Sequence, residues 1–179
     1  MESFWDRLPD DPTALVRGWL IEPPGGAATA SRELRKVAAS FEWIAAPPDH
    51  FLHVWVGPAR DVDAESARRS WSRVEPFAID YRRANCFHEA VIVEAHAGGV
   101  RRLVELGLPH VDRTVLLPHM SVGYTRRSER PAELRAALAP FRDAEFGRGL
   151  VREVLLCDVP VSRSTILQPW TVLDRVTLG

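Results

Sequence analysis

Two segments of this chain repeat one order of elements, and this repetition limits the folds that the chain can adopt. Residues 16–57 and 86–124 each contain an apolar strand candidate, then a helix candidate, then a second apolar strand. The second strand of each unit carries a histidine near its middle, His53 in the first and His119 in the second. The units share order and spacing rather than sequence identity, and they predict a duplicated fold that mixes helices and strands.

Hydrophobic periodicity and turn residues predict the remaining elements. Gly25-Gly26 reads as a turn and Gly98-Gly99 as the start of a helix. Pro118 inside a strand region indicates an edge or entry position. The strands are expected at 16–21, 51–57, 77–81, 86–94, 115–124, 151–159 and 171–178, and the helices at about 30–41, 63–74, 98–106 and 131–141.

A chain of 179 residues fits one domain, which we place at 17–179 after an irregular leader at 1–16. An apolar fraction of 46% and a charged fraction of 26% are typical of soluble globular proteins. No apolar run reaches the roughly 20 residues of a membrane helix, so no membrane partner is expected. The polar N-terminus lacks the apolar core of a secretory signal. We therefore expect a cytoplasmic monomer.

The charge balance argues against a partner such as long duplex nucleic acid. The net charge is −1 and the pI is near 6.6, without the basic excess of proteins that track nucleic acid. A nucleotide or the end of an RNA chain is the better expectation. Cys86 and Cys157 lack metal-ligand or redox-motif spacing and read as free buried thiols. No phosphate-binding glycine motif occurs, and no cofactor is expected.

The spacing of His50 and His53 resembles a metal-binding H-x-x-H pair, but it precedes a strand rather than lying on a helix. No carboxylate or thiol nearby completes a ligand set, so we expect no metal.

Alternation along the two histidine-bearing strands predicts a shared polar face. Residues i and i+2 of a strand face the same side, so His53 shares a face with Trp55, and His119 with Ser121. The intervening Val54 and its counterpart Met120 suit the opposite, buried face.

These two segments resemble the motif regions of the 2H phosphoesterase superfamily, which includes 2′-5′ RNA ligase-like proteins and cyclic phosphodiesterases. Members carry two H-x-[S/T]-x motifs, one in each half of a duplicated fold. Residues 47–57 (PPDHFLHVWVG) resemble the first motif region, and residues 117–122 (LPHMSV) match the second. The resemblance covers roughly 17–179. Tryptophan replaces the serine or threonine of the first motif.

The resemblance implies a bilobal α/β or α+β fold with two similar halves. Each half would hold an antiparallel sheet flanked by helices, and His53 and His119 would face each other across a central cleft. Two histidines can hold opposite protonation states near neutrality, as opening a 2′,3′-cyclic phosphate requires. Hydrolysis is expected over the reverse ligation, because water is abundant. Which histidine is the base and which the acid stays open.

The other candidate substrate-binding residues surround these histidines in sequence. Ser121 would donate to a non-bridging phosphate oxygen, and Trp55 would donate through its indole N–H, stack on a base, or block the site. His119, Ser121 and Tyr124 match an H-x-S-x-x-Y pattern of some cyclic phosphodiesterases. Strict alternation turns Tyr124 away, unless Gly123 supplies a bulge. Arg126 is a candidate phosphate ligand or a solvated loop residue.

Two alternatives from other functional classes remain open at this stage. One is a non-catalytic protein that binds nucleotides or RNA ends in the same cleft, with Trp55 stacking on a base. The other is an enzyme that acts on a small phosphoester other than a nucleotide. Turnover of nucleoside cyclic phosphates distinguishes both from the main hypothesis.

Overall fold

The computed structural model describes residues 1–60, 64–112 and 116–179. The expected strands at 16–21 and 171–178 and the helix at 98–106 lie close to their observed bounds. The strands are β1 (Leu15–Ile21), β2 (Ile44–Ala45), β3 (Val54–Pro58), β4 (Phe77–Phe87), β5 (Ala90–His96), β6 (His119–Thr125), β7 (Glu145–Val151), β8 (Glu153–Pro160) and β9 (Thr171–Thr177). The α-helices are α1 (Gly25–Ala30), α2 (Arg32–Ala39), α3 (Ala64–Trp71), α4 (Gly98–Gly107) and α5 (Ala132–Ala137), with 3-10 turns η1 (Trp5–Arg7), η2 (Asp49–Phe51) and η3 (Ala139–Phe141).

The strands form one antiparallel sheet in the order β7-β4-β5-β6-β3-β1-β8-β9, with β2 also paired to β6. The sequence predicted two antiparallel sheets. The structure instead has one continuous sheet, because the central strands β3 and β6 pair through Val54 and Met120. The expected mixed fold with two similar halves is confirmed, and this junction lies at the middle of it.

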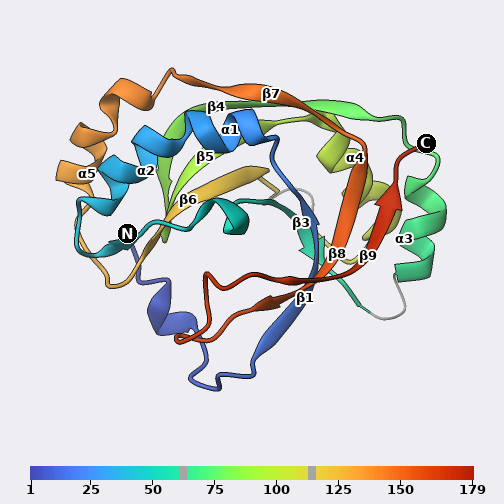
Figure 1. The fold of residues 1–179 in the computed structure, drawn as a ribbon, viewed down its shortest axis with the longest axis horizontal. Helices are drawn as coiled ribbons and strands as arrows, with labels where there is room; N and C mark the ends of the chain where they lie inside the picture. Colours follow the sequence, from blue (N-terminus) through green and yellow to red (C-terminus); the bar gives the residue numbers. More distant parts are fainter. Residues whose placement is uncertain (61–63, 113–115) are drawn as a thin grey trace.

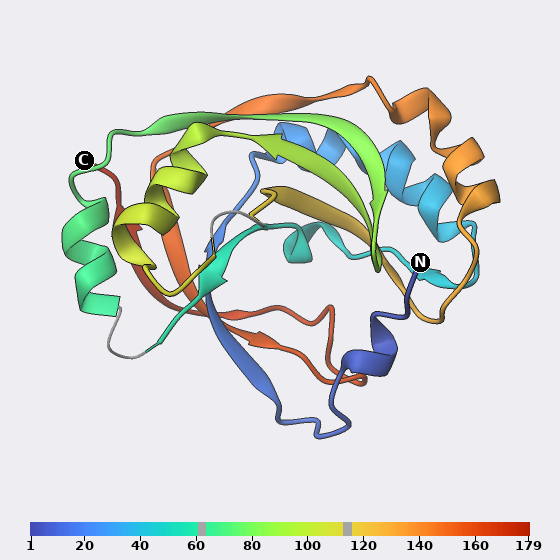
Figure 2. The ribbon, with the colours of Figure 1, turned by 180° about the vertical axis from the view of Figure 1, so that it is seen from behind.

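The duplication is visible in the connections. Strands β1 and β3 pair after a helical crossover, and so do β5 and β6. The helices cross over to the opposite half: α1 packs on β7 and α2 on β6, whereas α4 packs on β3. Figures 1 and 2 show α1, α2 and α5 toward one end of the molecule and α3 and α4 toward the other. This exchange ties the two halves into one unit.

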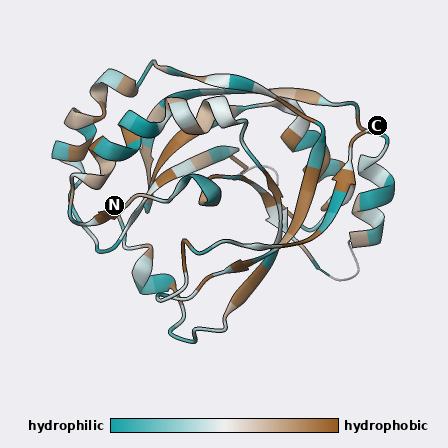
Figure 3. Cartoon of the chain, viewed as in Figure 1, coloured by the Kyte–Doolittle hydropathy of each residue, from teal (hydrophilic) through white to brown (hydrophobic). Residues whose placement is uncertain are grey.

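The two faces of the sheet bury different sets of side chains. The helix-covered face holds the main core, in which the Trp19 and Trp71 rings meet edge to face with centroids 4.7 Å apart. The opposite face carries a smaller cluster that includes Leu20, Ile92 and Cys157. Figure 3 shows apolar residues along the strands and polar stretches on the helices. Fully burying a large apolar side chain stabilises the fold by roughly 1.5–3 kcal/mol, so the helix-covered face dominates stability.

Several predicted elements differ from those observed. The single strand expected at 86–94 is a hairpin, because β4 ends at Phe87 and β5 begins at Ala90. The turn contains no glycine or proline to mark it. Instead His88 adopts a φ of 25°, in the left-handed region. Gly25-Gly26 begins helix α1 rather than forming a turn.

Other boundaries moved for local reasons. The strand expected from Phe51 begins at Val54, since residues 49–51 form a 3-10 turn after Pro47-Pro48. The helix expected at 131–141 breaks into α5 and η3 around Pro140, which cannot donate a helical hydrogen bond. Strand β7 was not predicted, because the run Gly147-Arg148-Gly149 at its centre breaks the apolar alternation of a strand. The predicted positions Asp63 and Val115 lie outside the described residues.

Candidate active site

His53 and His119 lie at the junction between the two halves. His119 is the first residue of β6, and His53 directly precedes β3. The antiparallel pair Val54–Met120 joins these strands. Continuing that register by one residue places His53 opposite Ser121 and Trp55 opposite His119, all on the face that the helices leave uncovered.

Each of the two imidazoles makes the same kind of hydrogen bond, to the backbone carbonyl two residues earlier. Nδ1 of His53 lies 2.7 Å from the carbonyl oxygen of Phe51, and Nδ1 of His119 lies 2.7 Å from that of Leu117. A carbonyl can only accept, so Nδ1 carries the proton in both rings, and each neutral ring keeps its lone pair on Nε2. The repetition of this geometry at both motifs leaves two matched Nε2 atoms for proton transfer.

Both histidines have depressed pKa values. Burial lowers the pKa of His53 to about 4, against the opposing effect of the Phe51 carbonyl, and the nearby His119 lowers it further. Burial also lowers the pKa of His119, which the Leu117 carbonyl partly offsets. This electrostatic interaction between the two rings accords with their positions on either side of the Val54–Met120 pair.

Aromatic rings enclose His53. The rings of Phe51 and Trp170 lie edge to face with it, at centroid distances of 5.4 and 5.2 Å, and Trp55 lies at 6.5 Å. This apolar surrounding is the physical cause of the low pKa of His53, since it disfavours the charged imidazolium. Beside His119 lies the ring of Phe87, with a centroid distance of 6.2 Å.

Trp55 lies against strand β1. A Cβ atom placed on Gly18 would lie 2.0 Å from Cη2 of the Trp55 ring, far inside van der Waals contact. The ring therefore occupies the space that the missing side chain of Gly18 leaves. Because Gly18 has no side chain, the ring of Trp55, which replaces the serine or threonine of the first motif, can pack directly on the backbone of β1.

A bulge in β6 brings Tyr124 to the same face as Ser121. Strand β5 pairs Ile92 with Ser121 and Val91 with Gly123, so β6 carries one extra residue between them. The side chains of Ser121 and Tyr124 then hydrogen-bond each other. Strict alternation would have separated them. Burial raises the pKa of Tyr124 to about 12, so its hydroxyl remains protonated near neutrality.

Arg126 is not brought to this group. It follows β6, seven residues after His119, a separation of roughly 23 Å along an extended strand. Its guanidinium lies 5.8 Å from the centre of the Trp5 ring, in a cation–π contact. The structure thus gathers His53, His119 and their neighbours and leaves Arg126 at the far end of the strand.

The loop that leads into His53 is fastened by a nearly buried arginine. Arg35 of α2 donates to the carbonyl oxygens of Pro47 and Ala28, at 3.0 and 3.2 Å, and to the carboxylate of Asp49. Its side chain is 10% exposed. These bonds hold the residues that precede His53 in place, so Arg35 is a positioning residue for the first motif.

Sequence reasoning missed five contributors to this site, namely Gly18, Arg35, Phe51, Phe87 and Trp170. Each acts through a contact between elements distant in sequence, apart from Phe51, which lies two residues before His53. An aromatic residue two positions before the motif histidine was the one local signal available.

Within residues 1–60, 64–112 and 116–179, no group of three or more His, Cys, Asp or Glu side chains is arranged to hold a metal ion. Over the same residues, no helix is long and apolar enough to cross a membrane. Cys86 and Cys157 form no disulfide, and Cys157 is buried whereas Cys86 is half-buried.

No family model and no curated protein sequence matches the chain. Solved structures do match it over nearly its whole length, and they define its fold as that of the 2H phosphoesterases, as the sequence resemblance predicted. They include LigT of E. coli complexed with ATP, at a TM-score of 0.68 and 15% identity, covering 93% of this chain and 99% of that one.

Two further structures give the same result. TT0787 of Thermus thermophilus matches with a TM-score of 0.65 and 16% identity, over 91% of this chain and 97% of that chain. A structure described as a phosphoesterase matches with a TM-score of 0.68 and 15% identity, over 92% and 98%. At this level of identity the likeness establishes the fold.

Proposed function

We propose that the protein is a metal-independent phosphodiesterase that opens 2′,3′-cyclic phosphates of nucleotides or RNA ends. The observation that carries this proposal is the matched pair of imidazoles. His53 directly precedes β3, and His119 begins the paired strand β6. Both rings are fixed by a bond from Nδ1 to the carbonyl two residues earlier. Two oriented Nε2 atoms at one site are what paired general acid–base catalysis requires.

The reaction needs one histidine of each protonation state. The base takes a proton from water as the water oxygen forms a bond to phosphorus. The acid gives its proton to the ribose oxygen as the bond from that oxygen to phosphorus breaks, which leaves a phosphomonoester and a free hydroxyl. Each group contributes roughly 10²–10⁴-fold to the rate.

The difference in surroundings supports one choice of base and acid. Aromatic rings on three sides make the protonated form of His53 the more costly, and its pKa is about 4. His53 is therefore the base. His119 has fewer apolar neighbours, and the negative charge of a bound phosphate favours its protonated form, which makes it the acid.

Ser121 and Tyr124 act together on the phosphate. Tyr124 stays protonated, and its hydrogen bond with Ser121 holds the serine hydroxyl beside the non-bridging phosphate oxygens. Tyr124 is then a positioning residue. Trp55 replaces the second hydroxyl of the family pattern. Because its ring leans on Gly18, it forms a wall of the site rather than a plug.

Comparison supports a nucleotide as substrate. LigT, whose fold this chain shares, has been crystallised with ATP, with NADP+ and with 3′-AMP. The aromatic rings around the two histidines of the present chain offer surfaces on which a base can stack, at roughly 1–3 kcal/mol per base.

The test is hydrolysis of the four nucleoside 2′,3′-cyclic phosphates in EDTA by wild type, His53→Ala and His119→Ala. His50→Ala is the matched control, because His50 is exposed and its ring lies 3.3 Å from the Leu167 carbonyl, outside the pair of motif histidines. Turnover is expected in EDTA, with a loss of at least about a hundredfold in each motif variant and none in the control.

Other outcomes lead to the alternatives. If wild type binds the nucleotides without turning them over, a binding protein with the same site becomes the better account. If it hydrolyses another phosphoester and ignores nucleosides, the enzyme class stands and the substrate changes. Activity that EDTA abolishes contradicts the paired-histidine mechanism.

A further inference from the structure

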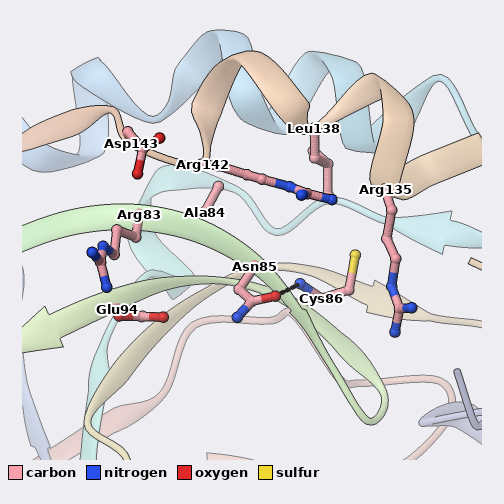
Figure 4. Close-up of a pocket in the computed structure, with 9 residues that line it drawn as sticks. All are labelled: Arg83, Ala84, Asn85, Cys86, Glu94, Arg135, Leu138, Arg142 and Asp143. Carbon is pink, nitrogen blue, oxygen red and sulfur yellow. Dashed lines mark hydrogen bonds between the residues drawn. The ribbon is translucent and has the colours of Figure 1, made fainter.

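A second, basic pocket lies beside the candidate active site. It has a volume of about 420 Å³ and is open between the free edge of β4 and the segment formed by α5 and η3. Figure 4 shows Arg135 reaching down from that segment, Arg142 extending beneath it toward Leu138, and Arg83 on the strand. The lining residues are Arg83, Ala84, Asn85, Cys86, Glu94, Arg135, Leu138, Arg142 and Asp143.

The pocket exists because the sheet edge is interrupted there. Strand β7 pairs with β4 only as far as Arg82, so the outer edge of β4 beyond it faces the pocket. Arg83 forms a bulge with a φ of 62°, a conformation that non-glycine residues adopt rarely and mostly at functional positions. Asn85 uses its side-chain oxygen to accept from the backbone N–H of Cys86, which keeps its amide hydrogens as donors.

The charges in the pocket favour an anion. Three guanidinium groups face two carboxylates, those of Glu94 and Asp143, which leaves one net positive charge. Across the described ranges, none of the three arginines forms an ion pair, whereas Glu94 is engaged by His96 at 3.0 Å. Arg135 contacts the Cys86 thiol instead. Exposed arginines without a carboxylate partner suit a phosphate, which they bind in a forked geometry.

The pocket wraps around the edge of β4: Ala84 and Leu138 line it from the helix-covered face, whereas Asn85 and Glu94 lie on the face that carries His119. Glu94, on its wall, is the direct cross-strand partner of His119. The Phe87 ring lies 6.2 Å from the His119 ring, and Phe87 is 40% exposed. Asn85 precedes it by two residues, so both face the same side, about 7 Å apart along the strand. An extended ligand bound at His119 would therefore contact the Phe87 ring first and the arginines next.

We infer that this pocket binds a backbone phosphate of an RNA chain whose 3′-terminal cyclic phosphate lies at His53 and His119. This rests on the proposed function and makes the RNA end, rather than a free nucleotide, the preferred substrate. The terminal base stacks on Phe87, and a phosphate on its 5′ side enters the arginine pocket. A nucleoside 2′,3′-cyclic phosphate has no such phosphate on its 5′ side and fills the catalytic site alone.

The experiment measures binding and turnover separately. Binding of a fluorescent RNA tetranucleotide that ends in a 3′-phosphate is measured for wild type, Arg135→Gln, Arg142→Gln and Arg142→Glu. The control is Arg73→Gln, an exposed arginine just after α3, which lies at the opposite end of the molecule from α5 (Figure 1). The ratio of kcat/KM for a tetranucleotide cyclic phosphate to that for a nucleoside cyclic phosphate is measured in parallel.

We expect each glutamine substitution to weaken tetranucleotide binding roughly tenfold, as the loss of a charged hydrogen bond does, and Arg142→Glu to weaken it further. The slope of log affinity against log salt should fall by about 0.7 for each arginine–phosphate interaction removed. The kcat/KM ratio should fall in parallel, and Arg73→Gln should match wild type. Because these arginines are exposed, the variants should keep the wild-type melting temperature.

The two proposals fail in different ways. If the variants bind the tetranucleotide as tightly as wild type, or if Arg73→Gln weakens it equally, the pocket has no such role, whatever the turnover. If wild type fails to hydrolyse either substrate while the pocket variants alone lose affinity, the arginine site stands and the catalytic proposal falls. Equal kcat/KM on both substrates in wild type also overturns the inference.

Discussion

The contact between Gly18 and Trp55 gives a prediction that can be worked through from the structure. In Gly18→Ala the new methyl would lie 2.0, 2.5 and 2.7 Å from three carbons of the Trp55 ring. Ordinary carbon–carbon contact needs at least about 3.5 Å, so the ring must move by roughly 1.5 Å. Because β1 lies behind it, the ring moves away from the sheet, into the site that it now borders.

The cost has two measurable parts. Overpacking of this kind destabilises a fold by about 1–3 kcal/mol, and each kcal/mol lowers the melting temperature of a chain of this size by about 2–4 °C. Displacing a group of the site by about 1 Å costs on the order of a hundredfold in rate. We expect Gly18→Ala to melt roughly 3–10 °C lower and to lose about 10–100-fold in kcat/KM on a nucleoside cyclic phosphate.

A double-mutant cycle with Trp55→Ser tests the cause. Removing the ring removes the clash, so Gly18→Ala should cost little stability in the Trp55→Ser background, with a coupling energy of at least about 1 kcal/mol. Gly98→Ala serves as the control, because a Cβ there meets nothing within 4 Å. If Gly18→Ala costs as much without the tryptophan as with it, the reasoning is refuted.

Three further predictions concern the histidines and their support. With His53 as base and His119 as acid, kcat/KM should rise as pH increases through about 4. It should fall again at a pH below the ordinary histidine value of 6.5, because burial lowers the pKa of His119. A pH–rate profile that is flat from 5 to 8 would contradict the assignment. The pKa of His53 is about 4 in the folded chain and about 6.5 in the unfolded chain, so between pH 4 and 6.5 the unfolded chain binds more protons. The free energy of unfolding should therefore decrease as pH drops from 6.5 to 4, by at most about 3 kcal/mol. Chemical denaturation at pH 7 and pH 4.5 should show a smaller decrease for His53→Gln than for wild type. Arg35→Met leaves two carbonyls and a carboxylate without their hydrogen-bond donor, so it should lower the free energy of unfolding by about 2–4 kcal/mol and also lower kcat/KM. Arg35→Lys should recover part of both losses. A melting temperature of Arg35→Met equal to that of wild type would show that these bonds do not stabilise the loop before His53.

Local sequence pattern was sufficient to predict several features of the fold and the site. Period-two alternation placed Val54 and Met120 on the buried face and His53 and Ser121 on the other, and the sheet bears this out. The order of strand, helix and histidine-bearing strand predicted the duplicated fold. Pro47-Pro48 marked the loop before the first motif, although not the 3-10 turn that delays β3.

Features that depend on contacts between distant segments emerged only in the folded chain. The β6 bulge that brings Tyr124 to Ser121 follows from pairing with β5, and the space for Trp55 comes from a glycine on β1. The hairpin turn at His88 contains no glycine, proline or asparagine from which the sequence could have predicted it. The low pKa of His53 comes from rings at positions 51, 55 and 170, which only folding brings around it. Local pattern sets which face a side chain takes, whereas the neighbours that tune its chemistry come from long-range packing.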